Sequence, residues 1–138
     1  MNYDDKRCEV IFDDGFIRII YHEPSELALH DFMEYADTLY ERNKDRFASY
    51  YLIIAPNGLP PFVSYVNHLR DLSQQFQDNS ERVNYIAYLL PNVGLLGCLL
   101  TAATRHWRPT AQIRIFNMTQ EAEAIAWLKS NQRNHPPE

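Results

Sequence analysis

The sequence predicts an α/β domain in which a mixed five-stranded sheet is packed with helices. Three observations lead to this prediction: an Asp-Gly turn between two β-rich runs near the start, two nearly continuous apolar runs in the middle, and apolar residues at helical spacing between the strands. Strand–helix–strand units favour parallel pairing with right-handed crossovers, and an opening hairpin adds one antiparallel pair. The expected order of elements is β-β-α-β-α-β-α-β-α.

The opening hairpin and the first helix are predicted from local signals. Cys8–Phe12 and residues 16–21 are rich in β-branched and aromatic side chains, and Asp13-Asp14-Gly15 lies between them. Ser25 is then expected to cap a helix, because its hydroxyl can accept a hydrogen bond from a free backbone N–H in the first turn. The inner face of this helix is expected to hold Leu29, Phe32, Met33, Ala36, Leu39 and Tyr40, and Asn43-Lys44-Asp45 is expected to end it.

Two buried strands and two more helices are predicted in the middle of the chain. Residues 50–55 and Val83–Leu90 are nearly continuous apolar runs, which are typical of parallel strands covered on both faces. A helix is expected to begin near Pro60 or Pro61, since proline is well tolerated in the first helical turn. Residues 93–107 predict a helix that is apolar nearly all round, so this domain, a second subunit or an apolar ligand must cover it.

The last third of the chain repeats the alternation of strand and helix. Residues 111–116 predict a strand, Asn117-Met118-Thr119 a capped turn, and residues 120–128 a closing helix. The buried face of that helix is expected to hold Ala124, Trp127 and Leu128. We expect residues 131–138 to be a disordered tail, so that a single domain spans residues 1–130.

Composition and charge argue against several classes of protein. The 138 residues fit one domain that can bury a core without disulfides or metals. The net charge of −5 gives no long-range attraction to a phosphate backbone, so nucleic acid is not an expected partner. The longest apolar run, residues 93–103, is shorter than the roughly 20 residues that a transmembrane helix needs. Two distant cysteines and no secretory region after Met1 lead us to expect a cytoplasmic protein.

The sequence contains no recognisable catalytic, metal-binding or cofactor-binding motif. It has no G-x-S-x-G elbow, no glycine-rich phosphate loop and no H-E-x-x-H pattern, so we expect no cofactor and no metal. No two histidines have the i, i+4 spacing of a helical metal site. We interpret all five as surface or capping residues: His22, His30, His68, His106 and His135.

The order of elements and a few short stretches resemble the STAS domain class, and more closely its SpoIIAA-like family. The stretches are the hairpin around Asp14-Gly15, the strand at 52–55 with the 56–61 loop after it, and the ending Ile115-Phe116 followed by Ala124-Ile125-Ala126-Trp127-Leu128. Members of that family typically end in a phenylalanine-containing strand and an Ala-x-x-Trp-Leu helix. The resemblance implies a non-catalytic signalling module similar to the anti-sigma-factor antagonists of this class.

The 56–61 loop is where the chain departs from those antagonists. They resemble one another in an Asp-Ser-Ser-Gly-Leu stretch, whose serine a partner kinase phosphorylates, and the comparable stretch here is Ala55-Pro56-Asn57-Gly58-Leu59. Both serines are absent, so a kinase-driven switch is not expected at this loop. The loop still follows a buried strand, at the carboxyl edge where open α/β sheets bind partners or ligands. The residues expected to bind are Pro56, Asn57, Gly58, Leu59, Pro60 and Tyr65.

Three functional hypotheses follow from these observations. The first is a non-catalytic signalling module that binds a protein partner or a small apolar or anionic ligand at the 56–61 loop. A homodimer that covers the apolar residues 93–107 is a compatible addition. The alternative is a small enzyme whose residues meet only in space at the carboxyl edge of the sheet, for example Tyr65, His68 and His106.

Overall fold

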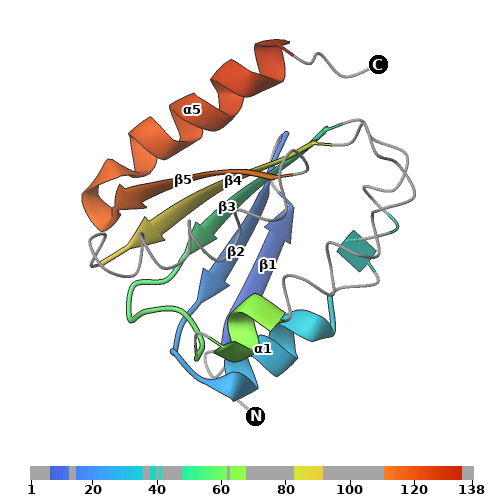
Figure 1. The fold of residues 1–138 in the computed structure, drawn as a ribbon, viewed down its shortest axis with the longest axis vertical. Coiled ribbons are helices and arrows are strands. Elements are labelled where there is room, and N and C mark those ends of the chain that lie inside the picture. Colours follow the sequence, from blue (N-terminus) through green and yellow to red (C-terminus); the bar gives the residue numbers. More distant parts are fainter. Residues whose placement is uncertain are drawn as a thin grey trace.

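In the computed structural model, the described residues are 7–12, 15–35, 38, 39, 41, 48–61, 63–67, 83–91 and 111–134. They form one mixed five-stranded sheet with a helix on each face (Figure 1). The strands lie side by side in chain order: β1 (Cys8–Phe12), β2 (Ile17–Tyr21), β3 (Ala48–Ile54), β4 (Val83–Leu90) and β5 (Ala111–Asn117). The helices are α1 (Glu26–Met33), the short 3-10 helix η3 (Met118–Gln120) and α5 (Glu121–Asn134). The predicted α/β class and mixed sheet are therefore confirmed.

The hairpin prediction is confirmed by the pairing of β1 with β2. The two strands are antiparallel, with Phe12 opposite Ile17 and Cys8 opposite Tyr21. Gly15 lies in the turn between them with φ of +87°, a conformation that side chains other than glycine rarely adopt. The carbonyl of Gly15 accepts a hydrogen bond from the side chain of Gln132, which ties the turn to α5.

The remaining strands are parallel, and the described helical segments between them share one face of the sheet. β2 pairs with β3, β3 with β4 and β4 with β5, all in parallel register. Parallel strands in chain order with right-handed crossovers place every connection on the same side. Both α1 and the helical turn at 63–67 contribute buried residues to the same core cluster, as this rule requires.

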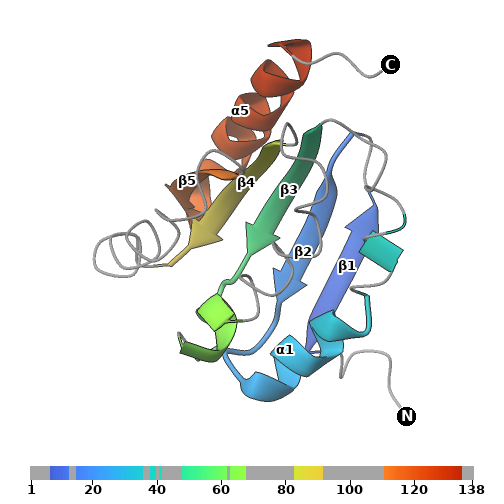
Figure 2. The ribbon, with the colours of Figure 1, turned by 45° about the vertical axis from the view of Figure 1, so that its right-hand side comes forward.

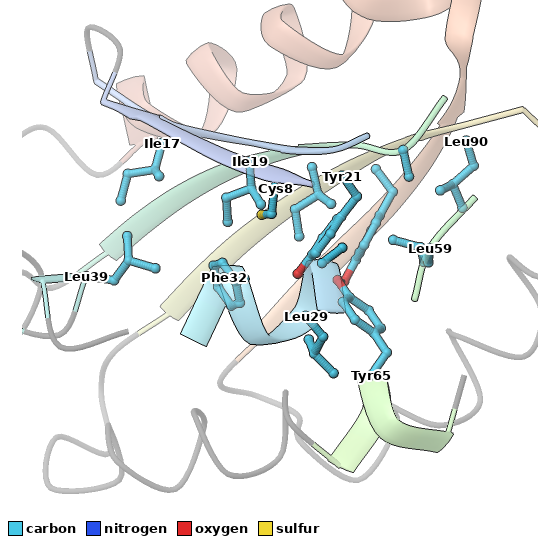
Figure 3. Packing of buried hydrophobic residues seen from close by; sticks show 14 residues of the cluster. Cys8, Ile17, Ile19, Tyr21, Leu29, Phe32, Leu39, Leu59, Tyr65 and Leu90 are labelled. Carbon is cyan, nitrogen blue, oxygen red and sulfur yellow. The ribbon is translucent and has the colours of Figure 1, made fainter. Parts of the chain in front are cut away.

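The face that α1 covers, called here the α1 face, holds the larger group of buried side chains. Figure 3 shows Tyr21, Phe32 and Tyr65 close together beneath the sheet. The Tyr21 ring centroid lies 6.1 Å from that of Phe32 and 5.9 Å from that of Tyr65, both in edge-on contacts. The other buried residues of this cluster are Cys8, Ile17, Ile19, Ala28, Leu29, Leu39, Ile53, Ala55, Leu59, Tyr88 and Leu90.

The opposite face, called here the α5 face, is covered by α5. Ala124 and Leu128 are fully buried against the sheet. The Trp127 ring centroid lies 6.1 Å from that of Tyr85 and 6.4 Å from that of Phe116. The predicted inner face of the closing helix is therefore confirmed.

Both ends of α1 can be compared with the prediction. The Ser25 hydroxyl accepts a hydrogen bond from the backbone N–H of Ala28 at 3.1 Å, so the predicted cap is confirmed. The helix ends at Met33 with Glu34 as its C-cap, so the end predicted at Asn43-Lys44-Asp45 is wrong. Met33 is 47% exposed, so its predicted place on the inner face is wrong. An α-helix turns about 100° per residue, so the side chain of Met33 points about 100° away from that of Phe32 and leaves the buried face.

The start and end of the closing helix are also described. Before the helix, Asn117 and Gln120 form a capping box, in which the Gln120 side chain accepts from the Asn117 backbone N–H at 2.8 Å. The side chain of Asn131 donates to the carbonyl of Trp127 at 2.9 Å. α5 continues through Asn134, past the predicted domain end at residue 130.

Two predictions fall outside the described residues. They are the apolar helix over 93–107 and most of the helix expected after Pro60, of which the structure describes the helical turn at 63–67. In the described part of the chain, no helix is both long and apolar enough to cross a membrane.

Truncation of Leu128 tests how strongly α5 depends on its buried face. Leu128→Ala should lower the free energy of unfolding by about 2–5 kcal/mol, because it leaves a cavity between α5 and the sheet. Leu27→Ala is the matched control, since Leu27 is 53% exposed on α1. The control should change stability by less than about 0.5 kcal/mol. Urea unfolding measures both variants, and equal losses would contradict the described packing of α5.

Candidate functional site

The candidate site lies where β2 and β3 end next to each other. Ile20 pairs with Ile54 near the carboxyl ends of these parallel strands. Beyond β3, the N–H of Ala55 still donates to the carbonyl of Leu89 on β4, at 3.0 Å. The segment 22–25 that leads into α1 and the 56–61 loop therefore emerge from the same edge of the sheet.

A tight turn begins the 56–61 loop. The N–H of Gly58 donates to the carbonyl of Ala55 at 3.1 Å, which closes a four-residue β-turn with Pro56 in its second position. Gly58 has φ of +105°. A Cβ atom added to Gly58 would lie 3.7 Å from the Cβ of Pro24, an ordinary contact. The backbone conformation, rather than lack of space, is what favours glycine here.

Asn57 ties this turn to the segment in front of α1. Its side-chain amide donates to the backbone carbonyl of His22 at 2.9 Å. Asn57 and Pro56 are both exposed, and Gly58 is half-buried. The hydrogen bond to His22 thus fixes the turn to the edge of the sheet, and the outer surface of the turn faces solvent.

The second half of the predicted site belongs to the interior. Leu59 and Pro60 are buried, and Leu59 is part of the α1-face cluster. The N–H of Tyr65 donates to the carbonyl of Pro61 at 2.9 Å, which opens the helical turn at 63–67. Tyr65 is only 1% exposed. Of the six predicted binding residues, the three in the turn reach the surface and the other three anchor it.

The hydroxyl of Tyr65 lies 2.9 Å from the hydroxyl of Tyr88, and both side chains are buried. Burial raises the pKa of Tyr65 well above its ordinary value, and the neighbouring Tyr88 and Tyr21 raise it further. Burial also raises the pKa of Tyr88. Both hydroxyls therefore stay protonated at neutral pH, where each satisfies the other as a hydrogen-bond partner.

Cys8 lies in the same interior and is 2% exposed. Burial raises the pKa of its thiol to about 12, and the charges of Asp31 and Glu9 add to that shift. The thiolate is the reactive form of cysteine, so a thiol held protonated in this way is chemically inert at neutral pH.

A group of charged side chains surrounds the start of α1. Arg7 lies between two carboxylates, with its Nε 3.9 Å from Oε1 of Glu23 and its Nη1 3.7 Å from Oδ1 of Asp31. Nε2 of His22 lies 3.5 Å from Oε1 of Glu9. Among the described residues, no three His, Cys, Asp or Glu side chains gather closely enough to hold a metal ion.

Several of these contacts join residues that the sequence does not connect. The Tyr65–Tyr88 pair and the Asn57–His22 hydrogen bond depend on how neighbouring strands are aligned. His68 and His106, which belong to the enzyme hypothesis, lie outside the described residues.

Comparison with models of protein families, with curated proteins and with solved structures gives no match for this chain.

A double-mutant cycle tests the buried tyrosine pair. Tyr65→Phe and Tyr88→Phe should each lower the free energy of unfolding by about 1–3 kcal/mol, because each leaves the other hydroxyl buried without a partner. The double variant should lose clearly less than the sum of the two, since it removes both hydroxyls. Urea unfolding of all four proteins gives the coupling energy, and strictly additive losses would mean that the hydroxyls do not interact.

The raised pKa of Cys8 predicts a stability change at alkaline pH. The unfolded chain ionises this thiol above pH 9.0, whereas the folded chain keeps it protonated up to about pH 12. Its contribution to stability is therefore complete below pH 9.0 and is lost as the pH rises toward 12. The loss is at most about 1.4 kcal/mol per pH unit.

Urea unfolding between neutral pH and the onset of tyrosine ionisation measures this effect. Cys8→Ala should show a shallower decline above pH 9.0 than the natural chain, besides a constant packing loss at every pH. Parallel curves for the two proteins would contradict a buried, protonated thiol.

Proposed function

We propose that this chain is a non-catalytic signalling module of the SpoIIAA-like type within the STAS class, which binds its partner at the turn formed by residues 55–58. The observation that carries the proposal is the Asn57–His22 hydrogen bond, which holds an exposed turn in one position at the carboxyl edge of the sheet. A turn that is already ordered loses little conformational entropy when a partner binds.

The contacts around the turn support this preorganisation. The hydrogen bond from Gly58 to Ala55 closes the turn, and Leu59 anchors it in the α1-face core. Pro56 adds to the rigidity because its ring restricts the backbone. The exposed face of the turn consists of Pro56 and the outer side of Asn57.

The charges near the turn favour a protein partner over a small anion. The described segments 22–35, 48–61 and 63–67 contain no lysine or arginine, and their charged residues are Glu23, Glu26, Asp31 and Glu34. Arg7 lies 3.9 Å from Glu23 and 3.7 Å from Asp31, so it offsets part of this charge and a net negative charge remains. An anionic ligand would meet repulsion from these carboxylates, whereas basic side chains of a protein would be attracted. We therefore favour a protein whose contact surface carries basic residues next to apolar ones.

The serines closest to the turn already have structural roles. The Ser64 hydroxyl donates to the Glu26 carboxylate at 2.8 Å, which links the helical turn at 63–67 to α1. The Ser25 hydroxyl donates to Glu23 and accepts from the N–H of Ala28. These contacts favour binding that does not depend on phosphorylation of a serine at this site.

Pro56→Glu tests the proposal, with Ala126→Glu on the exposed side of α5 as the matched control. The full chain and both variants are captured from their own cells after cross-linking, and the bound proteins are quantified by mass spectrometry. A partner bound at the turn should be retained by the control and lose at least about tenfold in binding to Pro56→Glu, because a carboxylate then replaces the apolar proline ring and must be desolvated against the apolar part of the partner's surface.

Circular dichroism must first show that both variants keep the fold. A partner bound equally well by the natural chain, Pro56→Glu and Ala126→Glu would place the binding surface elsewhere. The same experiment with Asn57→Ala asks whether the hydrogen bond to His22 is needed to hold the turn.

A further inference from the structure

The two faces of the sheet are covered unequally. Among the described residues, α1 and the helical turn at 63–67 pack on the α1 face, and α5 packs on the other face. A helix about 10 Å across covers two or three strands spaced about 4.8 Å apart. α5 packs on β3, β4 and β5, and Figure 2 shows β1 and β2 extending beyond it.

Four side chains of the hairpin point to the α5 face beside the area that α5 covers: Glu9, Ile11, Arg18 and Ile20. Arg18 reaches Glu121 of α5, and Ile20 packs against the buried cluster of this face. We call these four residues the hairpin patch. They alternate along their strands with residues buried on the α1 face, such as Val10 and Ile19. Ile11 is 39% exposed, and the side chains of Glu9 and Arg18 are 36% and 26% exposed. Ile20 is half-buried.

The strand register gives this patch a definite pattern of charge. Glu9 lies opposite Ile20, and Ile11 lies opposite Arg18. The two isoleucines therefore occupy one diagonal of the patch, and the two opposite charges occupy the other. A solvated face of a hairpin is ordinarily polar, whereas half of this patch is isoleucine.

Such a pattern is complementary to itself. A two-fold axis along the isoleucine diagonal places each isoleucine of one chain against the same isoleucine of a second chain. It also places Glu9 of each chain against Arg18 of the other, so the dimer contains two Glu9–Arg18 pairs. This is the reciprocal contact that a symmetric dimer requires. The hairpins then cross at a steep angle, as in orthogonal packing of two sheets.

We propose that this chain forms a homodimer in which the hairpin patches of two copies pack face to face. Within each chain, Arg18 lies 3.3 Å from Glu121 and His22 lies 3.5 Å from Glu9. Exposed ion pairs of this kind contribute little to stability, so exchanging them for pairs between chains costs little. The patch is small for a permanent interface, and we expect a dissociation constant in the micromolar range.

The dimer is independent of the partner site proposed above. The patch faces the α5 side of the hairpin, whereas the turn at 55–58 lies at the carboxyl edge of the sheet. Changes to the patch should therefore leave binding at the turn unchanged, and Pro56→Glu should leave the dimer unchanged.

Sedimentation velocity over a concentration series from about 1 µM to about 1 mM tests the proposal on the full chain. The natural chain should pass from monomer to dimer within that range. A chain that stays monomeric throughout would overturn the proposal.

Charge reversal identifies the surface involved. Glu9→Arg and Arg18→Glu should each weaken self-association at least about tenfold, because each places like charges opposite each other in the symmetric contact. A mixture of the two variants should form a heterodimer with the affinity of the natural dimer, since every charge pair is then restored. A dimer that neither variant weakens, or a mixture that stays monomeric, would overturn the proposal.

A second substitution is needed to distinguish loss of the interface from misfolding, because Arg18→Glu also removes the ion pair with Glu121. Ile11→Asp should abolish dimerisation while circular dichroism and urea unfolding show an intact fold. Leu27→Asp is the matched control, since Leu27 is also exposed but lies on α1. Equal dimerisation of Ile11→Asp and the natural chain would place the interface elsewhere and overturn the proposal.

Discussion

The parallel pairing of β3 with β4 is the constraint on which the rest of this structure depends. Leu52 and Ala87 are buried on the α5 face, and Ile53 and Tyr88 are buried on the α1 face, so both strands need cover on both sides. In the described part of the chain, α1 and the helical turn at 63–67 cover one of these sides. The terminal helix α5 covers the other side, where it packs on β3, β4 and β5.

The position of the candidate site follows from the same pairing. β2 and β3 end side by side, so the segment before α1 and the 56–61 loop meet at one edge. Beneath that edge, the Tyr65–Tyr88 hydrogen bond joins the segment after the loop to the interior strand β4. A buried hydroxyl needs a partner, so this pair favours one position of the 56–67 segment over others of similar apolar burial. The exposed turn thus rests on a specific interior contact.

Local patterns in the sequence were enough to predict the elements but not the contacts between them. Val83–Leu90 and the Ser25 cap are as predicted, because a continuous apolar run and a capping hydroxyl are signals within a few residues. The position of Tyr65 could not be predicted, since a tyrosine beside a loop suits a surface as well as a core. Its burial is decided by Tyr88, which is brought beneath the loop by the strand register. The exposure of Met33 could not be predicted either, because apolar spacing alone does not show where α1 ends.

The hairpin patch and the turn at 55–58 both depend on β2, though they use different sides of it. Arg18 and Ile20 project from this strand toward the α5 face, and the carbonyl of His22, just after the strand, holds Asn57. β1, whose other edge pairs with no described strand, is joined to the sheet only through β2. The contacts that hold the turn are all made within one chain: Asn57 donates to the His22 carbonyl, and the N–H of Gly58 donates to the carbonyl of Ala55. A second hairpin packed on the other side of β2 leaves these contacts in place, so one strand can serve both surfaces without coupling them.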